Sequence, residues 1–338
     1  MSEALRAILQ ASGWNRAMRI RIVSWCAFAL VLAFEWSSAF AQTARMLIGY
    51  PPGGAVDVLG RLFAETMSEA VGRPVVVENR PGAVGQIAAE ALKAAAPDGN
   101  TLMVAPDATV IIRPQTLSKP PFDPLADFAP VAHAGNWAFA LGTHAGLPVR
   151  TLADYLSWVR ADSARASFAS SGAGGSTHFF GVLLGQTLGV PLAQVSYKGA
   201  GPAILDVVAG HVPATVQPLG TLLAQAKAGK IAVLGMSAKA RSPGAPDVPT
   251  FSELGYPALT ADGWFGIFSP AGTPAETVAK LNGAFVQAMR SSAVRDKMRN
   301  LDLEVREMSA PEFAAVVKAD YARWGPIIRA SGFRGDAP

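Results

Sequence analysis

Two glycine-rich loops, at residues 51–57 and 170–178, are the parts of the sequence best suited to bind a ligand. Each loop follows a predicted strand and ends in the first turn of a predicted helix. Glycine lets the main chain turn its N–H groups outward. A helix N-terminus adds unpaired donors and the positive end of a dipole. If the loops face each other across a cleft, they can bind the two ends of one small anion, most simply a dicarboxylate; the alternative is that both are ordinary strand–helix turns.

Single side chains near these loops are further candidates. His178 can donate a hydrogen bond to a ligand, or be a packed residue in the first turn of its helix. Asp57 is expected to cap a helix, with a ligand contact through water as the second interpretation. Lys198, in a third loop that follows a strand, is either a cation for the ligand or a solvated lysine. Asp206 can recognise an amino group if the ligand carries one, or be an ordinary acid on a helix face.

The sequence contains no pattern typical of a known catalytic or metal site. G-x-S-x-G, H-E-x-x-H and G-x-x-x-x-G-K-[ST] are missing, and residues 172–177 lack the third Gly of a dinucleotide fingerprint. The four His have no metal-ligand spacing. Ser176 and His178 are the nearest nucleophile–base pair, but residues two apart on a helix do not face each other. We therefore expect no catalysis, no cofactor and no metal; an exported hydrolase acting on a carboxylated substrate is the alternative.

The N-terminal residues have the pattern of a secretory signal. Three arginines precede the apolar residues 22–34, and an A-x-A cleavage site ends at Ala41. A membrane anchor is the alternative, but the apolar stretch is shorter than the ~20 residues that span a bilayer. Residues 1–41 are expected to be a cleaved signal peptide, with Met1 or Met18 as the start. The only cysteine, Cys26, lies inside this segment, so the mature chain has no thiol and suits an oxidising compartment. We expect a periplasmic protein.

Charge and length limit the class of partner and the number of domains. The formal net charge is +4, and no run of five Lys or Arg occurs among the 338 residues. A nucleic-acid groove needs clustered positive charge, so we expect no nucleic-acid partner. The length favours two domains.

Strands and helices are predicted to alternate in two blocks. In the first, a strand at 46–50 leads through one glycine loop to a helix at 57–71, followed by strands at 75–77 and 101–105 and a helix at 86–95. The second block begins near Thr143, and a helical tail starts after 264–269, with capping boxes at Thr273 and Ser309. This order predicts an α/β fold with parallel sheets. Two sequential domains and one interrupted domain both fit the pattern. The tryptophans near the block boundaries, Trp137 and Trp264, belong either to the cleft wall or to the core.

The chain resembles the substrate-binding proteins of tripartite tricarboxylate transporters, the Bug or TctC-like group, over essentially its whole mature length. Any one of the shared motifs is weak, but nine occur in order. They are YPPGG at 50–54 with Asp57 and Arg61, ENRPGA at 78–83 with Gly85, PDGNTL at 97–102, DPL at 123–125 with DFAPV at 127–131, SSG at 170–172 with His178, YKG at 197–199, RSP at 241–243, PDVPT at 246–250 with Glu253 and Gly255, and PAGTP at 270–274.

The resemblance implies a periplasmic-binding-protein fold: two α/β lobes joined by crossover segments, with the ligand cleft between them. Lobe 1 would comprise residues 42–142 and 267–338, and lobe 2 residues 143–266. The ligand would be a small organic carboxylate (a di- or tricarboxylate, an acidic amino acid or an aromatic acid). A monomer would deliver it to membrane permease subunits or present it to a sensor protein. The candidate ligand-binding residues are Tyr50, Gly53, Gly54, Ala55, Asp57, Ser170, Ser171, Gly174, Ser176, Thr177, His178, Tyr197 and Asp206.

The sequence departs from the family pattern at a few positions. Ala55 and Val56 replace the Gly, Ser or Thr that often precede the family's Asp, which removes a possible side-chain donor beside the ligand. Ser196 replaces a Pro, and Pro213 replaces an acidic residue. These changes bear on the identity of the ligand and leave the general mode of binding intact.

Overall fold

The computed structural model describes residues 43–336, and Ala44 onward forms one compact unit. The predicted signal peptide lies outside the described residues. Within the described part of the chain, no helix is long and apolar enough to cross a membrane.

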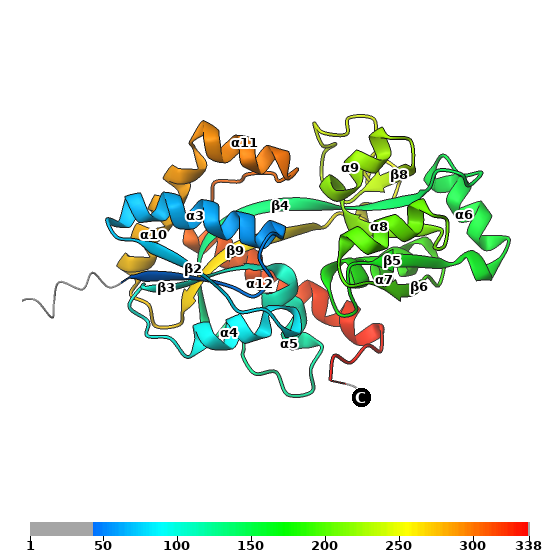
Figure 1. The fold of residues 1–338 in the computed structure, drawn as a ribbon. Coiled ribbons are helices and arrows are strands. Elements are labelled where there is room, and N and C mark those ends of the chain that lie inside the picture. Colours follow the sequence, from blue (N-terminus) through cyan, green and yellow to red (C-terminus); the bar gives the residue numbers. More distant parts are fainter. Residues whose placement is uncertain (1–42, 337–338) are drawn as a thin grey trace, which may run out of the picture. The chain divides into compact units, whose positions relative to one another are not determined.

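A mixed sheet of nine strands is the framework of the molecule (Figure 1), in the order β2-β1-β3-β9-β4-β7-β5-β6, with β8 also paired to β4. β1 pairs in parallel with β2 and β3, and β5 pairs in parallel with β6 and β7. The predicted parallel sheets are therefore present at both ends of this order. The strands are β1 Ala44–Ile48, β2 Val75–Asn79, β3 Thr101–Pro106, β4 Phe128–His144, β5 Ser167–Ser170, β6 Ala193–Ser196, β7 Ala214–Pro218, β8 Ile231–Met236 and β9 Asp262–Pro270.

Two antiparallel strands connect the parallel groups. β4 pairs with β9 from Phe128 to Ala138, and from Phe139 onward it pairs with β7 and β8. Most residues of β4 are buried, as expected for a strand covered on both faces. The sequence did not predict a strand of this length, because Pro130 and Gly135 interrupt the run and the pairing shifts register at both places. The exact lobe boundaries remain a prediction.

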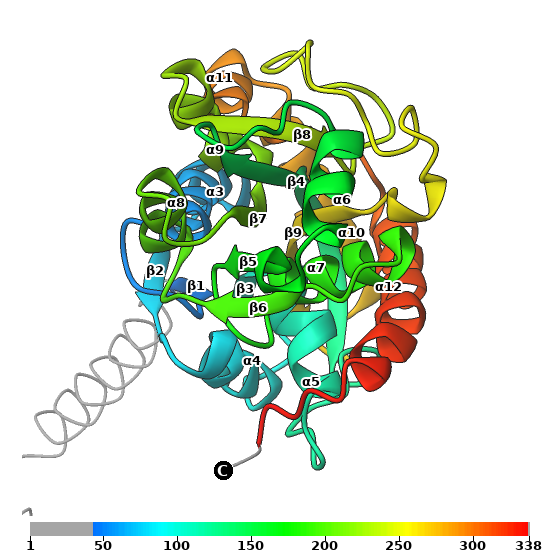
Figure 2. The same ribbon diagram turned by 90° about the vertical axis from the view of Figure 1, so that its right-hand side faces the viewer.

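Helices cover the sheet on both sides. α3 packs against α10, and α12 lies along β4 and also contacts α7; Figure 2 shows α12 (red) beside α7. The helices are α3 Ala55–Val71, α4 Gln86–Lys93, α5 Arg113–Gln115, α6 Leu152–Arg160, α7 Ser176–Leu188, α8 Ala200–Val208, α9 Leu219–Lys227, α10 Ala275–Met289, α11 Ser292–Asn300 and α12 Ala310–Ala330. Short helical turns are η1 Ala83–Gly85, η2 Ala108–Ile112, η3 Ser163–Arg165 and η4 Pro257–Leu259.

Of the two capping boxes predicted from the sequence, one is present and one is not. α12 begins with the predicted capping box, in which Ser309 and Glu312 exchange hydrogen bonds. The box predicted at Thr273 is wrong: α10 has Pro274 as its N-cap, and the Thr273 hydroxyl donates to the carbonyl of Pro270 at 2.7 Å. Because Pro274 is the N-cap, the Thr273 hydroxyl lies one residue before the cap position and makes no cap hydrogen bond to the helix.

Buried apolar residues form two clusters. The larger one spans both ends of the sheet order, and the smaller one lies under α8 and α9 around Ala140 and Ala203. Phe139 stacks on Phe180 with ring centroids 4.4 Å apart. This contact joins the middle of β4 to α7, so the long strand and the helix that carries one glycine loop are held together.

Candidate ligand-binding site

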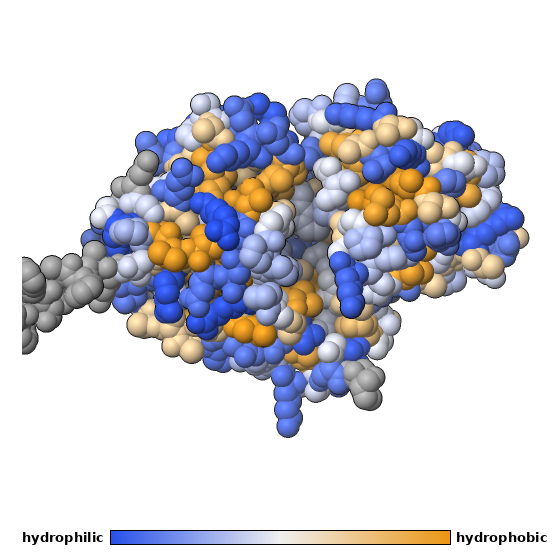
Figure 3. All heavy atoms as spheres, viewed as in Figure 1, coloured by the Kyte–Doolittle hydropathy of each residue, from blue (hydrophilic) through white to orange (hydrophobic). Residues whose placement is uncertain are grey.

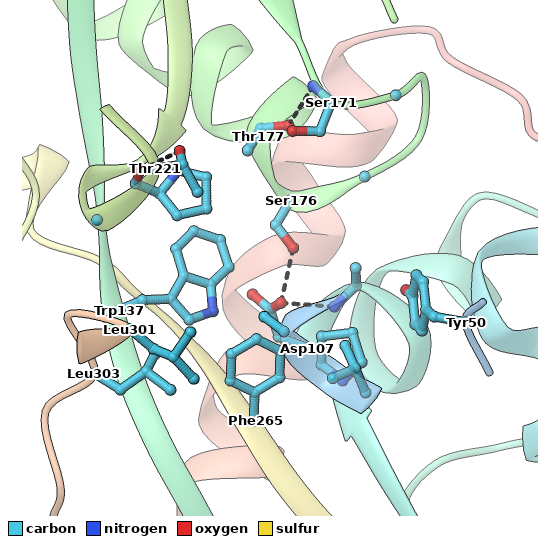
Figure 4. Close-up of a pocket in the computed structure, with 18 of the residues that line it drawn as sticks. Tyr50, Asp107, Trp137, Ser171, Ser176, Thr177, Thr221, Phe265, Leu301 and Leu303 are labelled. Atoms are coloured by element: carbon cyan, nitrogen blue, oxygen red, sulfur yellow. Dashed lines mark hydrogen bonds between the residues drawn. The ribbon is translucent and has the colours of Figure 1, made fainter. Parts of the chain in front are cut away.

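A cavity of about 520 Å³ lies where four chain segments meet: the N-terminal ends of α3, α7 and α9, and the turn between β3 and η2 (Figure 4). Figure 3 shows the surface hollowed between the part that carries α3 and the part that carries α8. The lining residues are Tyr50, Ala55, Val56, Val84, Pro106, Asp107, Ala108, Trp137, Ser171, Gly172, Ala173, Gly175, Ser176, Thr177, Pro218, Gly220, Thr221, Phe265, Asn300, Leu301 and Leu303.

The start of α3 presents main-chain donors to this cavity. Its N-cap, Gly54, has an extended conformation and no side chain that could cap the helix. Ala55 and Val56, the first two helical residues, line the cavity. The helix therefore starts two residues earlier than predicted, and its first turn is directed at the site.

Asp57 orders this turn. Its carboxylate accepts hydrogen bonds from the Gly53 N–H at 3.0 Å, from the Arg61 Nε at 2.9 Å and from the Asn79 Nδ2 at 2.9 Å. The hydrogen bond from Arg61 is the main reason that the pKa of Asp57 is lowered to about 2. Because its oxygens are engaged with three protein donors, Asp57 holds the loop in shape behind the cavity wall.

The start of α7 forms the opposite wall in a similar way. Gly175 is its N-cap, again extended and without a side-chain cap, and Gly175, Ser176 and Thr177 line the cavity. The Thr177 hydroxyl accepts a hydrogen bond from the Ser171 N–H at 3.3 Å, which closes the loop onto the helix. The predicted pair of glycine loops with open helix N-termini is thus brought to one cavity.

His178 lies behind this turn. Its Nδ1 accepts a hydrogen bond from the Gly174 N–H at 3.1 Å, and its ring packs against Phe179 and Phe333. Burial lowers its pKa to about 4, so the ring is neutral at neutral pH. Gly174 has a φ of 75°, which a glycine adopts without strain.

Asp107 is a buried acid in the cavity wall that the sequence reasoning missed. Its Oδ1 accepts hydrogen bonds from the Ala108 N–H at 2.7 Å and from the Ser176 hydroxyl at 2.8 Å. Its Oδ2 is buried and has no hydrogen-bond partner within the described chain. Burial raises the pKa of Asp107 to about 7. An acid at the carboxyl end of a predicted strand was the signal that could have identified it.

Apolar side chains form most of the remaining wall (Figure 4): Trp137 from β4, Phe265 from β9, and Leu301 and Leu303 from the turn after α11. The indole Nε1 of Trp137 is buried and lacks a hydrogen-bond partner among residues 43–336. Trp264, the other tryptophan at a block boundary, donates to Asp320 at 2.6 Å and does not line the cavity.

Tyr50 is fixed at the edge of the cavity by a strained turn. Its hydroxyl shares a hydrogen bond with Thr109 Oγ1 at 3.0 Å and donates to the carbonyl of Val84 at 3.4 Å. Burial raises its pKa to about 12. Ala83 and Val84 have φ values of 48° and 59°, which is uncommon for a β-branched residue and frequently found near binding sites.

The predicted candidates fall into three groups. Tyr50, Ala55, Ser171, Ser176 and Thr177 line the cavity; Gly53, Gly54, Asp57, Ser170, Gly174 and His178 lie in the same two loops but are not among its lining residues. The hydroxyl of Tyr197 bonds to Asp206, whose other oxygen lies 3.0 Å from His211 Nδ1, and neither Tyr197 nor Asp206 lines the cavity. Lys198 is exposed and also outside the lining.

The nucleophile–base pair considered from the sequence is not assembled. The Ser176 hydroxyl donates to Asp107, and His178 Nδ1 accepts from a main-chain N–H. Neither group is placed to activate the other, because a general base must be within hydrogen-bond reach of its nucleophile.

Comparison with known proteins identifies the family. The family model of the tripartite tricarboxylate transporter family receptor (TctC) matches residues 59–333. The periplasmic binding protein BugD superposes with a TM-score of 0.74 at 27% identity, covering 86% of this chain and 98% of BugD. MatC of Rhodopseudomonas palustris with bound malate gives a TM-score of 0.74 at 30% identity, covering 85% of this chain and 98% of MatC. A second R. palustris protein, solved with adipate, gives 0.77 at 28% identity, covering 88% and 99%.

These findings confirm the resemblance and the fold read from the sequence motifs. The matched family consists of transporter receptors, so the expectation that the protein is not an enzyme is also confirmed. The chain belongs to the tripartite tricarboxylate transporter receptor family, and its two α/β lobes have the fold of periplasmic binding proteins.

Proposed function

We propose that the mature protein captures a small organic carboxylate in the periplasm and delivers it to the membrane subunits of a tripartite tricarboxylate-type transporter. The observation that carries this proposal is the cavity between the uncapped N-termini of α3 and α7. Proteins similar to this chain have been solved with malate and with adipate, which supports a carboxylate as the ligand.

Main-chain donors are sufficient for this task. Each hydrogen bond to a charged carboxylate contributes ~1.5–3 kcal/mol, and association costs ~4–15 kcal/mol. Four such bonds, together with burial of the ligand's apolar surface against Trp137 and Phe265, bring micromolar binding, about −8 kcal/mol, within reach. In this proposal the loops at residues 50–57 and 170–178 remain the ligand-binding segments, with the side chains behind them fixing their shape.

Calorimetry on residues 42–338 with a panel of mono-, di- and tricarboxylates and amino acids tests the proposal. We expect one class of organic acid to bind with 1:1 stoichiometry and to be recovered unchanged. Failure of every organic acid in the panel to bind, or turnover of a bound one, would overturn the proposal.

Export has a separate test. We expect the protein purified from the periplasm of an expressing bacterium to begin at Gln42, and the intact mass measures this directly. Retention of residues 1–41 would contradict the predicted signal peptide.

A further inference from the structure

Two buried polar atoms at the cavity have no partner in the described part of the protein. Asp107 is fully buried and its Oδ2 is an unsatisfied acceptor; Trp137 is 9% exposed and its Nε1 is an unsatisfied donor. Both side chains line the cavity, and the indole nitrogen lies on the side of the Trp137 ring that faces Asp107 (Figure 4). A buried polar atom without a hydrogen bond destabilises the folded protein by ~1–3 kcal/mol. A ligand that supplied a donor to Asp107 Oδ2 and an acceptor to Trp137 Nε1 would remove this cost.

Asp107 is the only acidic side chain among the lining residues that the structure describes, and Lys, Arg and His are not among them. Asp320 of α12 adds further negative potential at Asp107. An ionised Asp107 would therefore repel a ligand carboxylate placed beside it, with no cation in that lining to offset the charge. A protonated amine placed there would supply the missing donor and the opposite charge.

We propose, on the basis of the function proposed above, that the ligand is a zwitterionic acid whose protonated amine binds Asp107 Oδ2. Its carboxylate oxygens accept from Trp137 Nε1 and from the main-chain amides at the starts of α3 and α7. The rest of the ligand packs on Phe265, Leu301 and Leu303. Asp107 is thus the residue that selects amine-bearing acids over di- and tricarboxylates.

The test compares the affinities of ligands that share a side chain and a carboxylate and differ in one substituent on the carbon next to that carboxylate. Phenylalanine, 3-phenylpropanoate and benzylmalonate carry an amine, a hydrogen and a second carboxylate at the same carbon; leucine, 4-methylpentanoate and isobutylmalonate repeat the comparison on a branched body. Glutamate and glutarate, which differ only by the amine, form a matched pair with an acidic side chain. Calorimetry should rank the amine first in the set that fits the cavity, by at least tenfold, about 1.4 kcal/mol.

The Asp107→Asn variant tests the assigned residue. The amide oxygen can still accept from Ala108 and Ser176, so the link to α7 is kept while the charge is lost. We expect at least a tenfold loss of affinity for the amine-bearing ligand and little change for its amine-free analogue. Asp302→Asn is the matched control: Asp302 sits between two lining leucines, but it accepts from the Ser242 hydroxyl at 2.8 Å and does not line the cavity. The Asp302→Asn variant should bind the ligand with the same affinity as the unaltered protein.

A pH series distinguishes the opposite arrangement, in which a protonated Asp107 donates to a ligand carboxylate. The titratable groups that interact with Asp107 are Tyr50, which follows β1, and Asp320 of α12. Because the pKa of Asp107 is raised to about 7, protons compete with an amine ligand, and its affinity should rise from pH 6 to pH 8. If Asp107→Asn does not fold, this series on the unaltered protein is the test.

The outcomes separate this inference from the proposed function. A diacid or an amine-free acid as the best ligand, with affinity unaffected by Asp107→Asn or falling as pH rises, overturns the role of Asp107 and leaves the proposed function standing. Failure of all organic acids to bind overturns the proposed function itself. An amine-bearing acid from the wider panel that depends on Asp107 supports the inference even if none of the matched ligands fits.

Discussion

At the scale of single residues, two buried acids at the site are in opposite electrostatic states. Asp57 is surrounded by donors, one of them Arg61, which holds its pKa down at about 2. Asp107 has two neutral donors on one oxygen and, within the described chain, none on the other, and burial raises its pKa to about 7. Asp57 therefore holds a loop in its conformation, whereas Asp107 has a carboxylate oxygen that is free within the described part of the chain and that a ligand can bind.

Replacing Asp57 by Asn should destabilise the protein by about 1–3 kcal/mol at pH 7, because Arg61 and the Gly53 N–H lose a charged acceptor. The folded-state pKa lies below the unfolded value, so this stability is present above about pH 4 and is lost as pH falls towards 2. Urea unfolding of both proteins between pH 7 and pH 3 measures the difference. The exposed Glu65 of the same helix gives the control, since Glu65→Gln should change stability by less than about 0.5 kcal/mol. Equal stability of Asp57→Asn and the unaltered protein at pH 7 would contradict the assigned role.

Asp107 should have the reverse effect on the unliganded protein. Its folded-state pKa is above the unfolded value, so the folded state binds the proton more tightly, and stability should decline as pH rises from about 4 to 7. Asp107→Asn should reduce that decline in thermal unfolding. Asp320 and Asp262, whose pKa values are also raised by burial, should maintain part of it. An identical decline in the variant would show that Asp107 does not titrate in this range.

At the scale of elements, the site depends on how closely the end of β1 approaches the turn at 83–85. A Cβ added at Gly49 would lie 2.4 Å from the Gly85 Cα, so only glycine permits this contact between two main chains. The same turn supplies Val84 to the cavity and binds the hydroxyls of Tyr50 and Thr109. Packing here therefore positions the wall of the site.

The Gly49→Ala variant should lose about 1–3 kcal/mol of stability and bind ligand more weakly, because the turn must move away from β1. Gly283→Ala is the matched control: no described atom outside its own helix turn lies within 4 Å of the place its Cβ would take, and the residue is exposed within α10. Alanine there should leave binding intact and raise stability by up to about 1 kcal/mol. Denaturant unfolding measures the stability of both variants, and calorimetry measures their ligand affinity. Unchanged ligand affinity in Gly49→Ala would show that the turn at residues 83–85 does not position the binding site.

At the scale of the whole molecule, residues from distant parts of the sequence meet at the cavity. Tyr50 and Asp107 follow the strands β1 and β3 at one end of the sheet order. Ser176 and Thr221 belong to the helices α7 and α9 at the other end, and Trp137 belongs to β4, which lies between them. The Ser176–Asp107 hydrogen bond links the two ends directly. A ligand in the cavity would contact both groups of elements, as expected for a hinged binding protein.

Ligand binding should therefore stabilise the entire fold. At a ligand concentration of 100 Kd, the free energy of unfolding should rise by about 2.7 kcal/mol. The shift of the thermal transition measures this, and an acid that calorimetry shows not to bind serves as the control. A bound ligand that left the transition unmoved would place binding outside the cooperatively folded unit.

Local signals in the sequence were enough to predict the class of fold and the two loops. Hydrophobic periodicity placed the helix α4 and the strand β3, and the glycine loops at 51–57 and 170–178 indicated the two open helix starts, because these features depend on neighbours in the chain. The ordered motifs identified the family for the same reason. Some local signals competed: Thr273 has the pattern of a cap, but its hydroxyl bonds to Pro270.

The tertiary structure decided the chemistry inside the cavity. Asp107 and Ser176 are far apart in the sequence. The strands β9 and β4 connect the two ends of the sheet, and in the folded chain the Ser176 hydroxyl lies 2.8 Å from Asp107 Oδ1. The burial that raises the pKa of Asp107, and the unsatisfied Trp137 Nε1, arise from side chains contributed by several elements. Such contacts cannot be predicted from the spacing of residues in the sequence, because burial and long-range pairing arise only when the chain is packed.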